Sequence, residues 1–288
     1  MKIIIKLILF KIKFFEIFLD KFKKRYLSFF IYEKLREKYT EIKILNKKVK
    51  FFTPSLYVYN RVNDISIHEP QTQTWIKSFV TKLPNQNIIF WDIGAAIGQF
   101  SIFASLVSEK ISVFSFEAST KNLNILSTNL SLNNLEDKIS ICPLPLGNST
   151  KVAMMKEKNN LEGKASNFLD TNFNKSKSIN QYSIMSLNID FLINNKIINA
   201  PNFLKIDTDG TEREIIEGGQ ELLANKQLLE VQIELTENTK NYQTVIDIMQ
   251  QHNFKLIKKF REITIIKLKF LITVLIKLYL LKKYLMEL

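Results

Sequence analysis

One stretch, residues 88–101, limits most strongly what this chain can fold into. It reads Ile-Ile-Phe-Trp-Asp-Ile-Gly-Ala-Ala-Ile-Gly-Gln-Phe-Ser. The apolar run at its start, rich in β-branched and aromatic residues, predicts a buried strand, and apolar residues recur at helical spacing from Phe100 onward. Gly94 and Gly98 allow a sharp turn and a close approach of a ligand to the backbone, while the following helix presents free N–H groups. The stretch therefore predicts a strand, a tight turn and a helix that together bind a ligand.

The residues of the turn bear on which ligand this is. A dinucleotide site requires Gly-x-Gly-x-x-Gly, whereas Ala95 and Ala96 fill this turn and Asp92 precedes it. This favours S-adenosylmethionine over NAD. The next expected strand, residues 111–116, ends in Glu117, whose carboxylate can accept hydrogen bonds from both hydroxyls of a ribose. Both cofactor classes use such an acid, so Glu117 predicts nucleoside binding without choosing between them. The alternative for both acids is a pair of solvated strand ends.

The rest of the chain alternates between strand and helix. This rhythm predicts an α/β fold with a mostly parallel central sheet, right-handed crossovers and flanking helices, with the ligand at the carboxyl ends of the strands. Two segments fall outside the rhythm: residues 46–60 predict short edge strands or a hairpin, and residues 151–190 predict an insertion with a hairpin and a loop over 159–180. Helices are expected at 99–108, about 120–133 and about 241–251, and further strands at about 139–144, just before Asp207, at 228–234 and at 254–258.

The net charge of +13 is distributed unevenly. Residues 1–50 carry +10 and residues 255–288 carry +7, so the remainder carries −4. A protein that follows a phosphate backbone requires a basic face on its folded domain, so we expect no nucleic-acid partner. The single cysteine, Cys142, excludes an internal disulfide, and a reducing, cytoplasmic setting is the expectation.

The charge pattern divides the chain into three parts: a basic, amphipathic helical extension over residues 1–45, one α/β domain over 46–260, and an apolar basic tail over 261–288. Charges interrupt the first part too often for a transmembrane span, and no signal-peptide cleavage site follows it. Two interpretations remain open. The helix contacts the inner face of a membrane as a peripheral anchor through residues 1–32, or it packs on the domain or on a partner subunit.

Three motifs in this order resemble the FkbM-type family of S-adenosylmethionine-dependent methyltransferases. Residues 91–98 resemble the Asp-x-Gly-Ala-Asn-x-Gly turn of the family, residues 115–119 its Phe-Glu-Pro strand end, and residues 205–212 its Lys-Ile-Asp-Val-Glu/Asp-Gly-x-Glu signature. The resemblance covers about residues 50–260. It implies a Rossmann-like class I methyltransferase fold and O-methylation of a hydroxyl on a sugar of a glycan or glycolipid precursor, or on another small molecule. Asp92, Gly94, Gly98 and Glu117 carry over as cofactor contacts, with Ala95 in the same turn, and Asp207 to Glu212 as the edge of the active site.

The sequence also departs from the family pattern. Ala96 replaces the usual Asn of the turn, and His68 stands where a Lys is common. The chain beyond Phe260 does not match the closing strands of the family.

Methyl transfer from a sulfonium is an in-line displacement, and an alcohol acceptor must also lose its proton. With only two histidines in the chain, a carboxylate is the expected base, and Asp207, Asp209 and Glu212 are candidates without a ranking. Asp207-x-Asp209 offers two metal ligands, which do not make a site, so no metal is expected. The same pair leaves a metal-dependent glycosyltransferase as an alternative. A membrane-associated scaffold that retains the fold without the chemistry is another.

Overall fold

The computed structural model describes residues 6–7, 10–11, 14, 38–157, 163, 167–170, 180–260 and 263–268. The predicted N-terminal amphipathic helix, the predicted loop over 159–180 and the tail after residue 268 lie outside the described residues, apart from the short pieces just named. Within the described part, no helix is long and apolar enough to cross a membrane.

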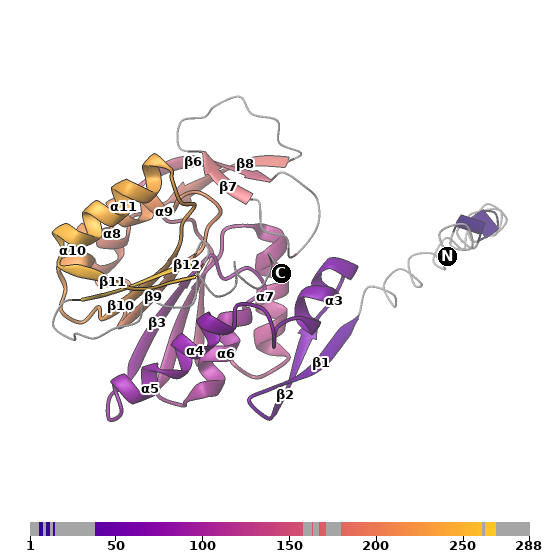
Figure 1. Cartoon of the computed structure of the whole chain (residues 1–288). Coiled ribbons are helices and arrows are strands. Elements are labelled where there is room, and N and C mark those ends of the chain that lie inside the picture. The colour runs from indigo at the N-terminus through magenta and orange to yellow at the C-terminus, as the bar shows by residue number, and fades with distance from the viewer. Residues whose placement is uncertain are drawn as a thin grey trace, which may run out of the picture.

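A seven-stranded sheet runs through the centre of the molecule in the order β11-β12-β10-β9-β3-β4-β5 (Figure 1). Strands β10, β9, β3, β4 and β5 are parallel, and β12 runs antiparallel to both of its neighbours. The strand order reverses at β3 and β9, which is where open α/β sheets bind ligands. The strands are β3 Ile88–Ile93, β4 Ile111–Phe116, β5 Ile139–Cys142, β9 Phe203–Ile206, β10 Glu230–Glu234, β11 Phe254–Phe260 and β12 Ile263–Leu268.

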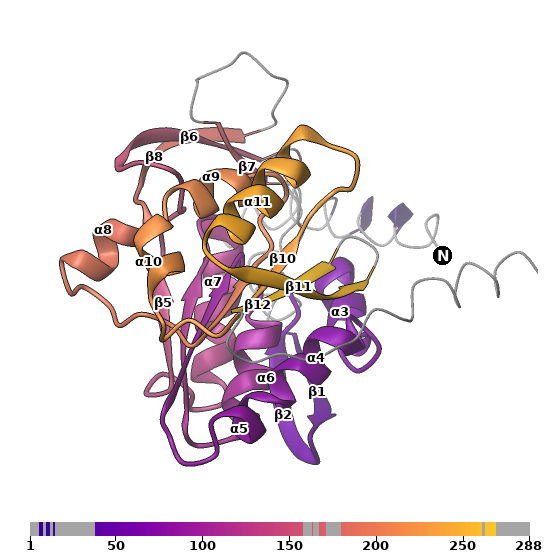
Figure 2. The same cartoon turned by 60° about the vertical axis from the view of Figure 1, so that its left-hand side comes forward.

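Each face of the sheet packs against its own layer of helices (Figures 1 and 2). Successive side chains of a strand point to opposite faces, so Phe90 belongs to one apolar core and Trp91 to the other. Phe203 stacks on Phe79, with ring centroids 3.8 Å apart, in the first core. The first layer contains α4 Pro70–Lys77, α5 Phe79–Lys82, α6 Gln99–Val107 and α7 Thr120–Ser131, and the second α8 Ile189–Asn194, α9 Glu212–Glu217, α10 Gln220–Ala224 and α11 Lys240–Gln251.

The face that carries Phe90 and Phe203 changes from apolar to polar toward the carboxyl ends of the strands. The strand register aligns one buried polar residue from each of four adjacent strands, and the residues two positions further along lie directly above them. We call these two rows the lower and the upper tier. The lower tier is Ser115, Asp92, Lys205 and Gln232, and the upper tier is Glu117, Gly94, Asp207 and Glu234.

The sheet extends past residue 260, where the sequence analysis places the end of the domain. Strand β12 pairs antiparallel with β10, from Glu230 opposite Lys267 to Glu234 opposite Ile263, and also pairs with β11. A strand hydrogen-bonded on both sides lies inside the sheet. One of its partners, β10, is distant in sequence, and the other, β11, precedes it across a tight connection. The local residue pattern therefore does not predict this strand.

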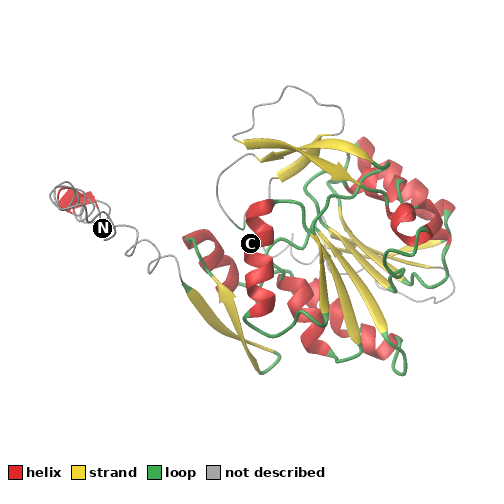
Figure 3. Ribbon diagram, turned by 180° about the vertical axis from the view of Figure 1, so that it is seen from behind, coloured by secondary structure: helices red, strands yellow, loops and turns green. Residues whose placement is uncertain are grey.

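The N-terminal boundary also differs from the expectation. Residues 39–44, assigned to the helical extension, form strand β1 Tyr39–Ile44, which pairs with β2 Lys47–Phe52 as a hairpin. Residues from Leu56, expected as edge strand or hairpin, form helix α3 Leu56–Asn63, because the Ser55 side chain caps its start by accepting a hydrogen bond from the Val58 N–H. The hairpin and α3 lie beside α7 (Figure 3).

The predicted insertion forms a small antiparallel sheet in the order β7-β6-β8. Its strands are β6 Lys151–Glu157, β7 Asn167–Asp170 and β8 Asn180–Ser186. The pairing of β6 with β8 confirms the predicted hairpin. In Figure 3 this sheet lies above the central sheet, and Met155 of β6 lines the pocket described next.

Candidate active site

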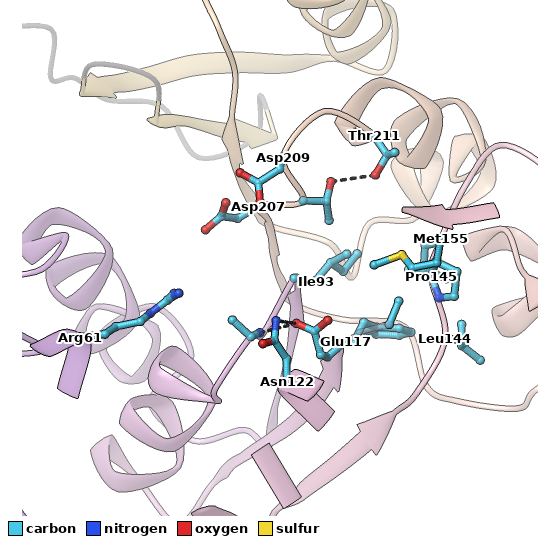
Figure 4. Close-up of a pocket in the computed structure, with 16 residues that line it drawn as sticks. Arg61, Ile93, Glu117, Asn122, Leu144, Pro145, Met155, Asp207, Asp209 and Thr211 are labelled. Atoms are coloured by element: carbon cyan, nitrogen blue, oxygen red, sulfur yellow. Dashed lines mark hydrogen bonds between the residues drawn. The ribbon is translucent and has the colours of Figure 1, made fainter. Parts of the chain in front are cut away.

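A pocket lies at the carboxyl ends of β3, β4 and β9 and contains about 690 Å³ of empty space, part of it continuous with bulk solvent. Figure 4 shows Asp207 and Asp209 on one side of this space and Glu117 with Asn122 on the other. Of the residues predicted to bind cofactor, Gly94 and Glu117 line the pocket, whereas Asp92, Ala95 and Gly98 are outside its lining.

The turn after β3 brings two strand ends into backbone contact. A Cβ atom placed on Gly94 would lie 1.7 Å from the carbonyl oxygen of Asp207, and the residue has a φ of +83°. Only glycine fits there. Ala96 also has a positive φ, of 50°, although it is not a glycine. The turn is thus held in a strained form that leaves its backbone exposed to the pocket and starts α6 at Gln99.

Glu117 lies in the pocket at the end of β4. Its carboxylate accepts hydrogen bonds from the backbone N–H groups of Ala96 (2.9 Å) and Ser119 (2.7 Å), and from the Asn122 amide (3.4 Å). Burial raises the pKa of Glu117 to about 7, although these donors favour its charged form. A buried carboxylate that is held rigidly and faces a cavity is suited to accept hydrogen bonds from a pair of vicinal hydroxyls.

The wall beside Glu117 is apolar. Phe116, Leu144, Pro145 and Met155 line it, and together they offer a surface on which a flat aromatic base can lie. A carboxylate for a ribose, an apolar wall for a base and a turn that lines the pocket at Gly94 and Ala96 are the groups that a nucleoside cofactor requires. The residues present therefore fit S-adenosylmethionine.

Asp92 has a different position from the one expected. Its carboxylate is buried in the lower tier, where Ser101 Oγ donates to Oδ2 (2.6 Å) and Lys205 Nζ lies 3.8 Å from Oδ1. Ser115 Oγ in turn donates to Ser101 Oγ (2.7 Å). Burial raises the pKa of Asp92 despite the nearby Lys205 charge. Asp92 thus supports the turn and Lys205 from below.

Lys205 links the two tiers. Its side chain is 2% exposed, and Nζ lies 2.8 Å from Asp207 Oδ2 and 5.1 Å from the centroid of the Phe100 ring. Burial alone would lower the pKa of Lys205, but the carboxylates of Asp207 and Asp92 raise it above its usual value. Lys205 is therefore a fixed cation under the active-site edge. The sequence analysis includes this lysine in a motif without assigning it a role.

Asp207, which lines the pocket, has two partners. Lys205 and the carboxyl of Glu234 both contact it, and against the effect of burial they hold the pKa of Asp207 well below its usual range. The hydrogen bond to Asp207, together with burial, raises the pKa of Glu234 to about 9. Asp207 is thus ionised and Glu234 protonated at neutral pH. Glu234 is not among the predicted site residues, although it is the last residue of the strand predicted over 228–234.

The other two predicted bases have different surroundings. The Glu212 carboxylate turns back on its own loop, where Oε1 accepts hydrogen bonds from the N–H groups of Thr208 and Gly210 (both 3.0 Å) and from Thr208 Oγ1 (2.9 Å). Glu212 therefore shapes the loop and lies outside the pocket lining. Asp209 lines the pocket, is exposed and has a φ of +58°.

Glu69, the residue just before α4, lies near the upper tier. Glu69 has a φ of +44°, and its carboxylate contacts His68 Nε2 (3.1 Å) and accepts from Thr72 Oγ1 (2.9 Å). Burial opposes ionisation, but the hydrogen bond with His68 and the Lys205 charge lower the pKa of Glu69. Glu69 is the residue before Pro70, and strain at this position indicates a functional constraint. His68 stacks on Phe100, with centroids 6.4 Å apart.

Arg61 of α3 lies across the pocket from the apolar residues Leu144, Pro145 and Met155, and it supplies a positive charge on that side (Figure 4). Its Nη1 donates to the Gly163 carbonyl (3.0 Å), and the Gly163 N–H donates to Asn122 Oδ1 (3.0 Å). The side chains of Arg61 and Asn122 both line the pocket. No sequence motif pointed to Arg61 or Asn122. Among the described residues, no group of three or more His, Cys, Asp and Glu is arranged to hold a metal ion.

A family model described as the methyltransferase FkbM domain matches residues 92–256. No curated protein matches the chain. Similar solved structures include the methyltransferase FkbM from Methylobacillus flagellatus (15% identity, TM-score 0.45, 73% of this chain and 53% of that one). Others are a precorrin-6y C5,15-methyltransferase from Geobacter metallireducens (13%, 0.39, 68% and 85%) and Aeropyrum pernix fibrillarin with bound S-adenosyl-L-methionine (8%, 0.37, 68% and 73%).

The present chain thus spans about half the length of the Methylobacillus FkbM methyltransferase. The family match begins at Asp92 and includes both tiers and the turn that shapes the pocket. The seven-stranded sheet of the chain, with its flanking helices, forms the Rossmann-like class I methyltransferase fold expected from the sequence. Because the match covers more than half of the 288 residues, the chain belongs to the FkbM family of methyltransferases.

Proposed function

We propose that this protein is an S-adenosylmethionine-dependent O-methyltransferase. The observation that carries the proposal is the pairing, in one pocket, of a rigid Glu117 carboxylate beside an apolar wall with an ionised Asp207 on the opposite side. The Glu117 carboxylate and the apolar wall suit the nucleoside of the cofactor. The ionised Asp207 suits an acceptor hydroxyl that must lose its proton. The family match supports the same chemistry.

Each part of the site has its own task in this scheme. S-adenosylmethionine, when bound, supplies a methyl group on a positively charged sulfur. Glu117 accepts hydrogen bonds from the ribose hydroxyls, and the backbone around Gly94 lies against the cofactor. Asp207, kept ionised by Lys205, accepts a hydrogen bond from the acceptor hydroxyl and orients its oxygen toward the methyl carbon. Orientation of this kind accounts for a large part of the rate of a displacement reaction.

The proposed acceptor is a small molecule with several hydroxyl groups, such as a sugar of a glycan or glycolipid precursor. Asp207 and Asp209 line the pocket, and Glu69 lies near enough to Asp207 for their charges to interact. Carboxylates accept hydrogen bonds from hydroxyl groups and repel anions. This arrangement supports a neutral polyhydroxylated acceptor at the position that is methylated.

Isothermal titration with S-adenosylhomocysteine tests the cofactor site. We expect saturable binding by the wild type and a loss of about 10- to 100-fold in Glu117→Ala, the range for hydrogen bonds to a charged group. Glu136→Gln, which changes an exposed carboxylate between α7 and β5, is the matched control and keeps full affinity. Asp92 is unsuitable for this test, because its removal would leave Lys205 buried with one partner fewer. Absence of binding by folded wild type would refute the proposal.

The basic N-terminal segment supports a second part of the proposal, peripheral contact of residues 1–32 with the inner face of a membrane. The charge of +10 over residues 1–50 suits anionic headgroups. Co-sedimentation with vesicles containing anionic lipid compares the full chain with a chain that begins at Lys38. We expect only the full chain to sediment with the vesicles, and equal sedimentation would contradict membrane contact through this segment.

A further inference from the structure

Asp207 and Glu234 occupy equivalent places on neighbouring parallel strands. Ile206 of β9 is paired with Ile233 of β10, so the next residue of each strand, Asp207 and Glu234, stands side by side in the upper tier. Their carboxyl groups share a hydrogen bond. The other side of Asp207 contacts Lys205 Nζ at 2.8 Å. The pair is therefore asymmetric, because Lys205 forms an ion pair with Asp207 and acts on Glu234 through its charge without one.

We propose that Asp207 and Glu234 form a carboxyl dyad that holds a single proton, with Asp207 as the base for the acceptor hydroxyl and Glu234 as the positioning residue that donates a hydrogen bond to it. This inference rests on the proposed methyl transfer. Two carboxylates in contact cannot both be ionised without a large electrostatic cost, so one of them retains a proton. Lys205 places the negative charge on Asp207 and leaves the proton on Glu234.

The dyad gives the reaction a balanced proton path. In the proposed transfer the acceptor oxygen forms its bond to the methyl carbon, and the electron pair of the broken carbon–sulfur bond stays on sulfur. The hydroxyl proton passes to Asp207, which makes the dyad neutral. The dyad returns to one negative charge by releasing a proton to solvent, which reaches the Asp207 side chain, 26% exposed.

The surrounding charges favour the same protonation state. Lys205 of β9 faces both carboxyls from below, and Glu69 at the start of α4 faces Glu234 with a like charge. Asp92 of β3 lies on the far side of Lys205, and the positive charge of Arg61 of α3 lowers the pKa of Asp207. A second negative charge on the dyad would face Glu69 directly. The like charge of Glu69 therefore opposes ionisation of Glu234.

The protonation of Glu234 is measured directly by carbon NMR of the full chain labelled with ¹³C at the glutamate carboxyl. We expect one resonance that titrates with a midpoint of about 9 and is absent in Glu234→Gln. Glu117→Gln is the matched control, because Glu117 also titrates high, at about 7, and the upper resonance stays when it is replaced. A Glu234 carboxyl that titrates in the ordinary range for glutamate would overturn the dyad.

The role of the dyad is measured by methyl transfer from tritiated S-adenosylmethionine to a set of octyl β-glycosides. Above pH 9 we expect the wild type to lose activity, because Glu234 loses the proton that it donates to Asp207. Gln reproduces the protonated form of Glu, so Glu234→Gln is expected to keep most of the activity and to show no such decline. Glu234→Leu, which donates no hydrogen bond, loses about 100-fold in turnover, the scale of acid–base assistance. Equal activity of the Gln and Leu variants would overturn the positioning role.

The two proposals fail separately. Circular dichroism establishes that each variant is folded, and titration with S-adenosylhomocysteine reports on the cofactor site, which Glu234 does not line. If folded wild type does not bind S-adenosylhomocysteine, the methyltransferase function fails whatever the NMR titration gives. If it binds and Glu234 titrates normally, the dyad fails and the methyltransferase function stands.

Discussion

Ala96 has a left-handed backbone conformation that suits other residues better. Its φ of 50° lies in a region that costs an L-residue with a Cβ about 1–2 kcal/mol. The family pattern has Asn at this position, and Asn is one of the few residues that enter this region readily. The sequence comparison noted the replacement, but its conformational meaning came from the backbone of the folded turn.

We predict that Ala96→Gly stabilises the protein by about 0.5–1 kcal/mol, since relief of the strain exceeds the entropy that glycine adds to the unfolded chain. Ala95→Gly is the matched control: the neighbouring residue has no positive φ, so the same change destabilises there. Urea unfolding of the three proteins measures the difference. A lower midpoint for Ala96→Gly than for the wild type would show that the turn is not strained.

If Glu117 has its proposed role, its raised pKa makes cofactor affinity depend on pH. In that role the ionised form accepts hydrogen bonds from both ribose hydroxyls, and with a pKa of about 7 it accounts for most of the molecules at pH 8 and few at pH 6. Affinity for S-adenosylhomocysteine is therefore expected to weaken about tenfold from pH 8 to pH 6, in proportion to the competent fraction. Titration calorimetry at several pH values checks this, with Glu117→Gln expected to show no such dependence. A flat profile in the wild type would contradict the assigned role.

At the scale of elements, one asparagine joins the N-terminal hairpin to the turn that follows β3. Asn129 of α7 is fully buried; Oδ1 accepts from the Phe52 N–H of β2 (2.7 Å), and Nδ2 donates to the Ile97 carbonyl (2.8 Å). The hairpin is thus attached to the same helix that supports the ligand-binding turn. Its contribution to the site is indirect, through the position of this turn.

Asn129→Ala leaves two buried backbone groups without partners and is expected to cost about 2–4 kcal/mol of unfolding free energy. Asn133→Ala, one helical turn along, removes hydrogen bonds to the exposed backbone of Lys50 and is expected to cost about 1 kcal/mol or less. Urea unfolding monitored by tryptophan fluorescence compares the two. Equal losses would mean that burial of Asn129 does not matter and that the hairpin is held by other contacts.

At the scale of the whole molecule, the sheet depends on a strand from the end of the described chain. β12 forms a ladder with β10 and another with β11, so its absence would leave two strands with unpaired edges. The site depends on it as well, because Glu234 is paired opposite Ile263 of this strand.

A chain that ends at Phe260 is therefore expected to be much less stable than one that ends at Leu268, by about 1 kcal/mol for each ladder hydrogen bond lost. The two truncations differ by this strand and its short connection alone, so their comparison isolates it. Urea unfolding gives the stability, and light scattering reports association through the exposed edges. Similar unfolding midpoints would mean that β10 and β11 close the sheet without β12.

Local residue patterns are sufficient to predict the alternation of strands and helices, the tight turn after β3 and the acids at the strand ends, because these depend on periodicity and on spacing within a few residues. They also place Glu117 and Asp207 correctly at one edge of the sheet, since carboxyl ends of parallel strands meet there.

Which acids face the pocket and which lie beneath it depends on contacts between distant segments of the folded chain. Asp92 is drawn below the turn by Lys205 and Ser101, Glu212 is used by its own loop, and Glu234 reaches Asp207 through strand pairing. The same pairing places β12 inside the sheet. Each of these outcomes depends on a contact between segments distant in sequence or on the direction of a side chain, and neither is fixed by the local pattern of residues.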